Sequence, residues 1–151
     1  MRADEIIERY AMQPIPQEGG WFAAGPRTPS LSGVTVLLTD RPDGFSAIHR
    51  LELDEGWQWL DGAPVTMLTL AGRSGASRDG RVHRLDRACA QAMVPAGTWQ
   101  GARTVGEWSL VACWCAPQFT EEHFSLGERG YLLEHFPEFC DDILALTRRV
   151  P

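Results

Sequence analysis

The feature that most constrains the fold is a series of short strand-like runs separated by turn residues. The runs cover residues 34–39, 45–51, 57–60, 65–70, 81–85, 91–94, 98–103 and 108–115. Most are rich in β-branched, aromatic or alternating apolar residues, and turn sequences such as Asp-Arg-Pro-Asp-Gly at 40–44 separate them. We therefore expect an antiparallel sandwich or barrel, with a hairpin between 34–39 and 45–51.

Helical patterns occur only near the two ends of the sequence. Residues 4–12 are amphipathic, and 128–136 and 139–146 show helical spacing on either side of Pro137. An aromatic strand is expected to begin at Trp21 after the paired glycines 19–20, followed by a loop over 26–32. We predict an all-β fold with short N- and C-terminal helices, and one domain over residues 1–151.

Charge and hydropathy exclude several function classes. The net charge is −6 and the sequence has no lysine, which argues against nucleic-acid binding. The arginines between 73 and 87 are interrupted by aspartates, which is typical of a solvated hairpin. Since there is no run of roughly 18 to 20 apolar residues and the first ten residues are highly charged, we expect a cytoplasmic protein with no membrane partner.

The four cysteines, Cys89, Cys113, Cys115 and Cys140, have no paired C-x-x-C spacing. Cys113 and Cys115 flank Trp114 on a strand-like run, so they share one face but are poorly placed to bridge each other. Buried free thiols are the expectation.

Two stretches, 46–62 and 94–100, place polar side chains among apolar ones. In the first, His49 and Glu55 alternate with aliphatic and aromatic residues, and in the second Gln100 follows Trp99. A carboxyl group surrounded by Trp57 and other rings loses hydration, which raises its pKa and suits it to proton transfer near neutral pH. We expect adjacent strands to bring His49 close to Glu55, either as a catalytic pair or as a structural one.

Alternation along the strand leaves the orientation of its tryptophans open. If Trp57 and Trp59 face the interior, they form an aromatic slot for a flat or apolar ligand. If the opposite face is interior, Gln58 is a pocket residue and the two rings pack elsewhere.

Several motifs, taken together, resemble the DUF985 family, also called Cupin_5. They are QEGGWF (17–22), AIHR (47–50), LDEGWQWLDGAPV (53–65), VPAGTWQGA (94–102), WSLVACWCAPQF (108–119) and HFSLG (123–127). The resemblance implies an RmlC-like cupin jelly roll, a homodimer and a small-molecule pocket inside the barrel. It also implies pocket residues at Glu18, His49, Glu55, Trp99 and Gln100. The family usually has histidine at the position of Gln58, glycine at that of Gln118 and glutamate at that of Ser125.

A cupin metal site needs a His-x-His pair, a carboxylate and a later histidine. Here His49 is followed by Arg50 and Leu51, and Gln100 occupies the later position. A metal held by His49 and Glu55 alone would lack ligands, so we expect neither a metal nor another cofactor.

Two functions remain after these exclusions. The first is a metal-independent isomerase, epimerase, cyclase or lyase acting on a small molecule. In it Glu55 transfers a proton, His49 orients Glu55 or acts as the complementary acid, and Gln100 binds a ligand carbonyl or hydroxyl. Trp99 with Trp57 or Trp59 would form the walls. The second is a non-catalytic protein that binds a small ligand in the same barrel.

Overall fold

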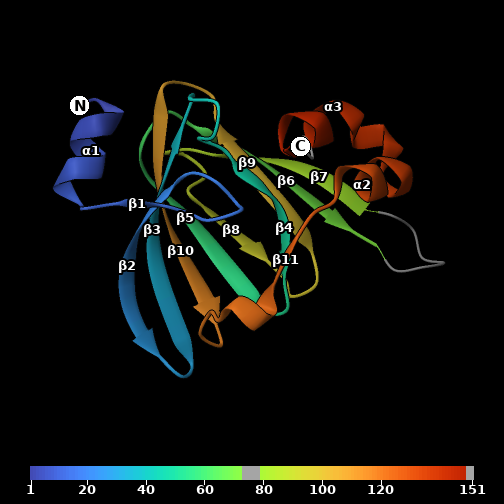
Figure 1. The fold of residues 1–151 in the computed structure, drawn as a ribbon, viewed down its shortest axis with the longest axis horizontal. Helices are drawn as coiled ribbons and strands as arrows, with labels where there is room; N and C mark the ends of the chain where they lie inside the picture. The colour runs from blue at the N-terminus through green and yellow to red at the C-terminus, as the bar shows by residue number, and fades with distance from the viewer. Residues whose placement is uncertain (73–78, 149–151) are drawn as a thin grey trace.

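The computed structural model describes residues 1–72 and 79–148, and it consists mainly of two antiparallel sheets that face each other (Figure 1). The six-stranded sheet has the order β1 (Gln13–Pro14), β2 (Trp21–Thr28), β3 (Leu31–Thr39), β10 (Trp108–Ala116), β5 (Asp54–Gly62) and β8 (Gln91–Val94). The five-stranded sheet has the order β11 (Phe124–Leu126), β4 (Ser46–Leu51), β9 (Trp99–Thr104), β6 (Val65–Ala71) and β7 (Asp79–Leu85). The predicted all-β antiparallel class is confirmed.

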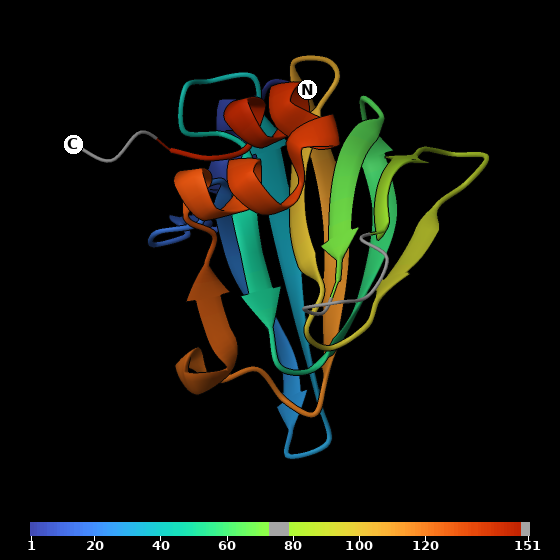
Figure 2. The same cartoon turned by 90° about the vertical axis from the view of Figure 1, so that its right-hand side faces the viewer.

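The α-helices lie at the two ends of the described chain, as predicted. They are α1 (Ala3–Arg9), α2 (Arg129–His135) and α3 (Cys140–Ala145), with 3-10 turns η1 (Glu121–His123) and η2 (Pro137–Phe139) beside the C-terminal pair. The Glu128 carboxylate caps α2 by accepting from the backbone N–H groups of Gly130 and Tyr131. Figures 1 and 2 show α2 and α3 against the five-stranded sheet, on the side away from the six-stranded sheet.

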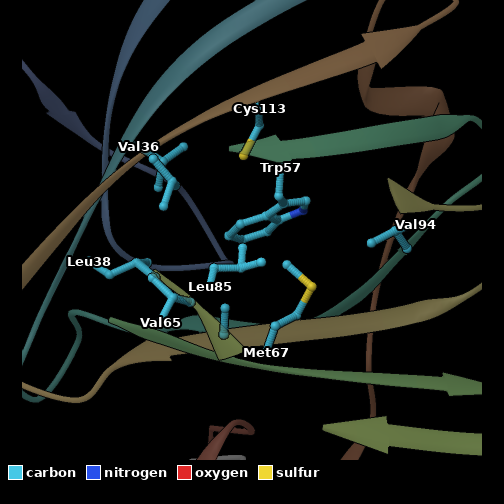
Figure 3. Close-up of a cluster of buried hydrophobic side chains, with 10 residues drawn as sticks. Val36, Leu38, Trp57, Val65, Met67, Leu85, Val94 and Cys113 are labelled. Carbon is cyan, nitrogen blue, oxygen red and sulfur yellow. The ribbon is translucent and has the colours of Figure 1, made fainter. Parts of the chain in front are cut away.

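The core between the sheets is built from alternate strand residues. Trp57 lies in its centre, 3% exposed, with aliphatic and sulfur side chains from both sheets around its ring (Figure 3). A second cluster joins Ile48, Leu68 and Leu70 of the five-stranded sheet to α2 and α3. Because successive strand residues point to opposite faces, β6 contributes to both clusters, with Val65 and Met67 in the first and Leu68 and Leu70 in the second.

The predicted hairpin between 34–39 and 45–51 is wrong. β3 belongs to the six-stranded sheet and β4 to the five-stranded one, so the turn at 40–44 takes the chain across to the facing sheet. The expectation that His49 and Glu55 lie on adjacent strands is wrong for the same reason, since β4 and β5 are in different sheets. Turn residues encode a reversal of direction, but they do not determine which strand the next one pairs with.

The expected loop at 26–32 is also mostly strand. β2 continues to Thr28 and β3 begins at Leu31, with a register shift between Ala24 and Arg27. Gly25 and Pro26 occupy the shifted segment, which is where a strand tolerates them. Two strands, β1 and β11, were not predicted.

The remaining sequence expectations concern the surface and the thiols. Arg73 and Arg78 lie outside the described residues, whereas Arg81, Arg84 and Arg87 are exposed, as a solvated hairpin requires. The four cysteines are free; Cys113 and Cys115 are buried, and Cys89 and Cys140 are exposed. Among residues 1–72 and 79–148, no helix has the length and apolar character needed to cross a membrane.

Candidate functional site

A cavity of about 590 Å³ lies between the two sheets near one end of the sandwich. Its largest wall comes from β2, β3, β10 and β5, and β4 of the facing sheet contributes His49 and Leu51. Segments 15–18 and 119–124 border it on the remaining sides. Its polar lining residues are Gln17, Glu18, Arg27, Ser32, His49, Glu55, Trp57, Cys113, Cys115 and Glu121. A cavity of this size fits a small organic molecule.

Strand register aligns four of these polar residues in one row across the six-stranded sheet. Glu55 is opposite Cys115, Cys115 is opposite Ser32, and Ser32 is opposite Arg27. Residues directly opposite each other in antiparallel strands share a face, and all four line the cavity. The adjacent rows contain Trp57, Cys113, Val34 and Ala24, then Val36 and Phe22, so the wall becomes apolar away from the polar row.

Glu55 is 7% exposed and makes two hydrogen bonds within the barrel. Its Oε1 accepts from Trp57 Nε1 at 3.1 Å, and its Oε2 accepts from Cys115 Sγ at 3.2 Å. Burial raises the pKa of Glu55 and the charge of Glu18 adds to the rise, against the lowering effect of His49 and of the two hydrogen bonds. The carboxyl group therefore holds a proton at a higher pH than an exposed glutamate does.

His49 faces Glu55 from the opposite sheet and is 2% exposed. Its Nδ1 lies 2.8 Å from the carbonyl oxygen of Ala47 and 3.7 Å from Glu18 Oε1, and its ring stacks on Phe124 with centroids 5.4 Å apart. Because a carbonyl oxygen only accepts, Nδ1 carries the hydrogen, which leaves Nε2 as the basic nitrogen when the ring is neutral. Glu18 is held in place by the Ser46 hydroxyl, which donates to its Oε1.

Gln100 contacts Trp57 but is not among the residues that line the cavity. It is opposite His49 on β9, is 1% exposed, and accepts a hydrogen bond at 2.8 Å from Trp57 Nε1. Trp57 thus donates to Glu55 on its own strand and to Gln100 on the facing sheet. These bonds fix the position of the Glu55 carboxyl group relative to His49.

Three other predicted site residues, Trp59, Gln58 and Trp99, do not line the cavity. Trp57 and Trp59 face the interior, but Trp59 packs against the core and donates to the carbonyl of Ala63 at 3.0 Å. Gln58 lies on the outer face, beside a smaller hollow that it shares with Met93 and Trp114. Trp99 is also on an outer face, where its ring contacts Tyr131 of α2 and the guanidinium of Arg50.

Six of the polar residues that line the cavity were not predicted as site residues from the sequence: Gln17, Arg27, Ser32, Cys113, Cys115 and Glu121. The sequence predicts Cys113 and Cys115 to be buried free thiols, which is confirmed, but it does not predict that they line the cavity. Burial, followed by the charge of Glu55, raises the pKa of both. Ser32 and Arg27 fell in the expected loop. Their only signal in the sequence was the polar character of that segment, which a surface loop explains equally well.

The residues present do not fit the metal site that a cupin fold implies. Within the part of the chain that the structure describes, no group of three or more histidine, cysteine, aspartate or glutamate side chains is arranged to hold an ion. The Nδ1 atom of His49 is directed at the Ala47 carbonyl, and Glu55 is engaged by Trp57 and Cys115. No step below depends on a metal.

The two facing sheets with a cavity between them define a cupin, the double-stranded β-helix class of protein. The family model described as "Cupin superfamily (DUF985)" matches residues 4–127, and the chain belongs to this family, Cupin_5. This confirms the family resemblance and the cupin-type fold expected from the sequence. Comparison with curated proteins gave no match.

Solved structures agree with this assignment. A structural-genomics protein from Shewanella oneidensis is 25% identical, with a TM-score of 0.84 and 99% of each chain covered. A hypothetical protein from Leishmania major is 22% identical, with a TM-score of 0.86, and the match covers 99% of this chain and 100% of that one. An oxalate decarboxylase from Lactobacillus farciminis, 11% identical with a TM-score of 0.59, shares the fold over 91% of this chain and 42% of its own.

Proposed function

We propose that the protein is a metal-independent enzyme that moves a proton on a small organic molecule bound in the cavity. Isomerisation, epimerisation, cyclisation and elimination by a lyase all share such a step. The observation that carries the proposal is the buried carboxyl group of Glu55, which lines the same cavity as His49. Burial raises the pKa of this group, so it holds a proton beside a bound ligand at a higher pH than an exposed glutamate does. A carboxyl group and an imidazole of this kind can supply one proton donor and one proton acceptor.

The contacts of each group support complementary roles. Glu55 has no lysine or arginine partner within 4 Å among the described residues, and burial raises its pKa, which favours the protonated form that can donate. His49 uses Nδ1 to donate to Ala47, and this contact keeps Nε2 as the acceptor. Proton transfer from the ligand to His49 and from Glu55 to the ligand would shift a double bond or invert a C–H centre with no net change in protons.

Exchange of ligand hydrogens with solvent tests this proposal directly. The protein would be incubated in D₂O with a panel of small carbonyl compounds, and deuterium incorporation followed by ¹H NMR. We expect exchange at one carbon of at least one compound, reduced about 10²- to 10⁴-fold in Glu55→Gln. Glu107→Gln, which changes an exposed carboxylate, is the matched control and should exchange like the parent.

If Glu55→Gln exchanges a compound as fast as the parent does, Glu55 is not the proton-transfer group. If the whole panel binds to the parent without exchange, the second function holds, a non-catalytic small-ligand protein. One observation favours that alternative: both Glu55 oxygens already accept hydrogen bonds from protein donors, as in a purely structural carboxyl group. A binding protein should then lose affinity alone in Glu55→Gln, because it has no turnover to lose.

A homodimer is proposed as the assembly. The family resemblance motivates it. Among residues 1–72 and 79–148, β8 is an edge strand of the six-stranded sheet with no partner on its outer side, and Met93 is 66% exposed and Trp114 39% exposed on the adjoining outer face. Sedimentation velocity at micromolar concentration should show two chains, with dissociation in Met93→Glu. A monomeric parent would exclude this assembly.

A further inference from the structure

We propose that Arg27 binds an anionic group of the ligand at the mouth of the cavity, so that the substrate is an elongated carboxylate or phosphate with an apolar body. The inference rests on the proposed function only in placing the reacting end of the ligand at Glu55. The binding of the anion itself depends on Arg27 and can be measured without any turnover.

Strand register sets the position of Arg27 relative to Glu55. Arg27 and Glu55 occupy the two ends of the polar row, with Ser32 and Cys115 between them. Three interstrand spacings of about 4.8 Å separate their backbones by about 14 Å along the sheet. A ligand that contacts both ends must therefore be elongated, and its anionic end must lie at β2 when its reacting end lies at Glu55.

The guanidinium group of Arg27 is held in one orientation by the segment that borders the cavity. Its Nη1 donates to Gln118 Oε1 at 3.2 Å and to the carbonyl oxygen of Phe119 at 2.8 Å. Among the described residues both of its hydrogen bonds leave from Nη1, and no carboxylate lies within 4 Å. Nε and Nη2 remain as donors, and together they match the two oxygens of a carboxylate or phosphate.

The side-chain oxygen of Gln118 is one of the two acceptors that orient Arg27, and the backbone carbonyl of Phe119 is the other. Glycine at position 118 would remove the first acceptor and leave the second, so Gln118 contributes part of the fixed orientation.

The wall next to the polar row accounts for the apolar body of the ligand. Phe22, Val34 and Val36 line the cavity from β2 and β3, and Phe119 and Phe124 line it from the bordering segment. Such side chains favour a hydrocarbon or aromatic portion over a heavily hydroxylated one. Glu121 and Glu18, which line the cavity from its two bordering segments, oppose an anion there, so selectivity must come from the directed donors of Arg27 as well as from charge.

The test compares four probes built on a phenylalkyl body. They are 3-phenylpropionate, 2-phenylethyl phosphate, the neutral 3-phenylpropanamide and the cationic 3-phenylpropylamine. Binding would be followed by ¹H–¹⁵N NMR of the Arg27 side chain and by fluorescence of the parent. We expect at least one of the two anions to bind roughly tenfold or more tightly than the amide, as a charge-assisted hydrogen bond allows, and the amine to bind most weakly. Whichever anion binds tighter identifies the carboxylate or the phosphate class.

Variants assign the preference to Arg27. Arg27→Gln should bind the anions and the amide equally, and Arg27→Lys should keep part of the preference because it keeps the charge without the planar donors. Gln118→Gly should retain the charge but bind the anions several-fold more weakly. Arg103→Ala, which removes an exposed arginine that does not line the cavity, is the matched control and should match the parent.

Three results would overturn the proposal: equal binding of anions and amide by the parent, preference for the amine, or an anion preference that survives in Arg27→Gln. Failure of both anions to bind at tens of millimolar would overturn it as well. Glu55→Gln separates this proposal from the proposed function. If Glu55→Gln keeps the anion preference and also leaves deuterium exchange unchanged, the catalytic assignment fails while the anion site stands.

Discussion

Trp57→Phe is the substitution that tests the linkage between the two sheets. The indole N–H of Trp57 donates to Glu55 Oε1 at 3.1 Å and to Gln100 Oε1 at 2.8 Å, and the ring is 3% exposed at the centre of the core. Phenylalanine keeps most of the apolar ring but has no donor. Two buried acceptors on facing sheets therefore lose the same partner.

The expected cost follows from those two acceptors. A buried polar group left without its partner costs about 1–3 kcal/mol, and the smaller ring leaves additional unfilled volume. We expect Trp57→Phe to lower the free energy of unfolding by about 2–5 kcal/mol. Chemical denaturation of the parent and the variant would measure the difference.

The pH dependence distinguishes this mechanism from a simple packing loss. Burial raises the pKa of Glu55, and the hydrogen bond from Trp57 partly opposes that rise. A carboxyl group whose folded pKa exceeds its unfolded value destabilises the fold as pH rises from the unfolded value, near 4.5, through the folded one. Without the Trp57 donor the folded pKa rises further, so the gap between the parent and Trp57→Phe should widen with pH.

Trp59→Phe is the matched control, because its indole donates to the Ala63 carbonyl, which does not titrate. It should lose stability by an amount that is constant with pH. If Trp57→Phe also shows a constant loss between pH 4 and pH 8, the Trp57 bond does not stabilise the charged form of Glu55, and the account of the site given above is wrong.

Three further outcomes are expected. The free energy of unfolding of the parent should fall as pH rises through the pKa of Glu55, whereas that of Glu55→Gln should stay level over the same range. The two free energies should diverge by about 1.4 kcal/mol for each unit by which the folded pKa of Glu55 exceeds the unfolded one. Parallel pH profiles from denaturation would contradict this. Cys115→Ala should raise the pKa of Glu55, because it removes a hydrogen bond that lowers it, whereas Cys115→Ser should not; ¹³C NMR of the labelled carboxyl group measures both. The purified protein should carry no stoichiometric transition metal by elemental analysis, and about one equivalent per chain that is lost in His49→Ala would refute that expectation.

The sequence was informative wherever a property depends on neighbours along the chain. The strand at 46–51, the helix around Leu132 and the burial of Glu55 between aromatic residues all follow from local alternation or helical spacing, and the structure contains them. Alternation also gave the two possible faces of β5. The choice between them depended on the facing sheet, which places Trp57 inside and Gln58 outside.

The pairing of strands could not be derived in the same way, and the candidate site depends on it. His49 and Glu55 line the same cavity from facing sheets, an arrangement that the turn pattern alone did not predict. The row from Arg27 through Ser32 and Cys115 to Glu55 joins residues from four strands, and only long-range register aligns them. Because residues 26–32 were predicted to form a loop, Arg27 and Ser32 were not considered as strand residues. At Gly25 and Pro26 the strand register shifts, and pairing resumes at Arg27, whose side chain faces the cavity. Polar residues beside such a register shift should therefore be considered as possible strand residues.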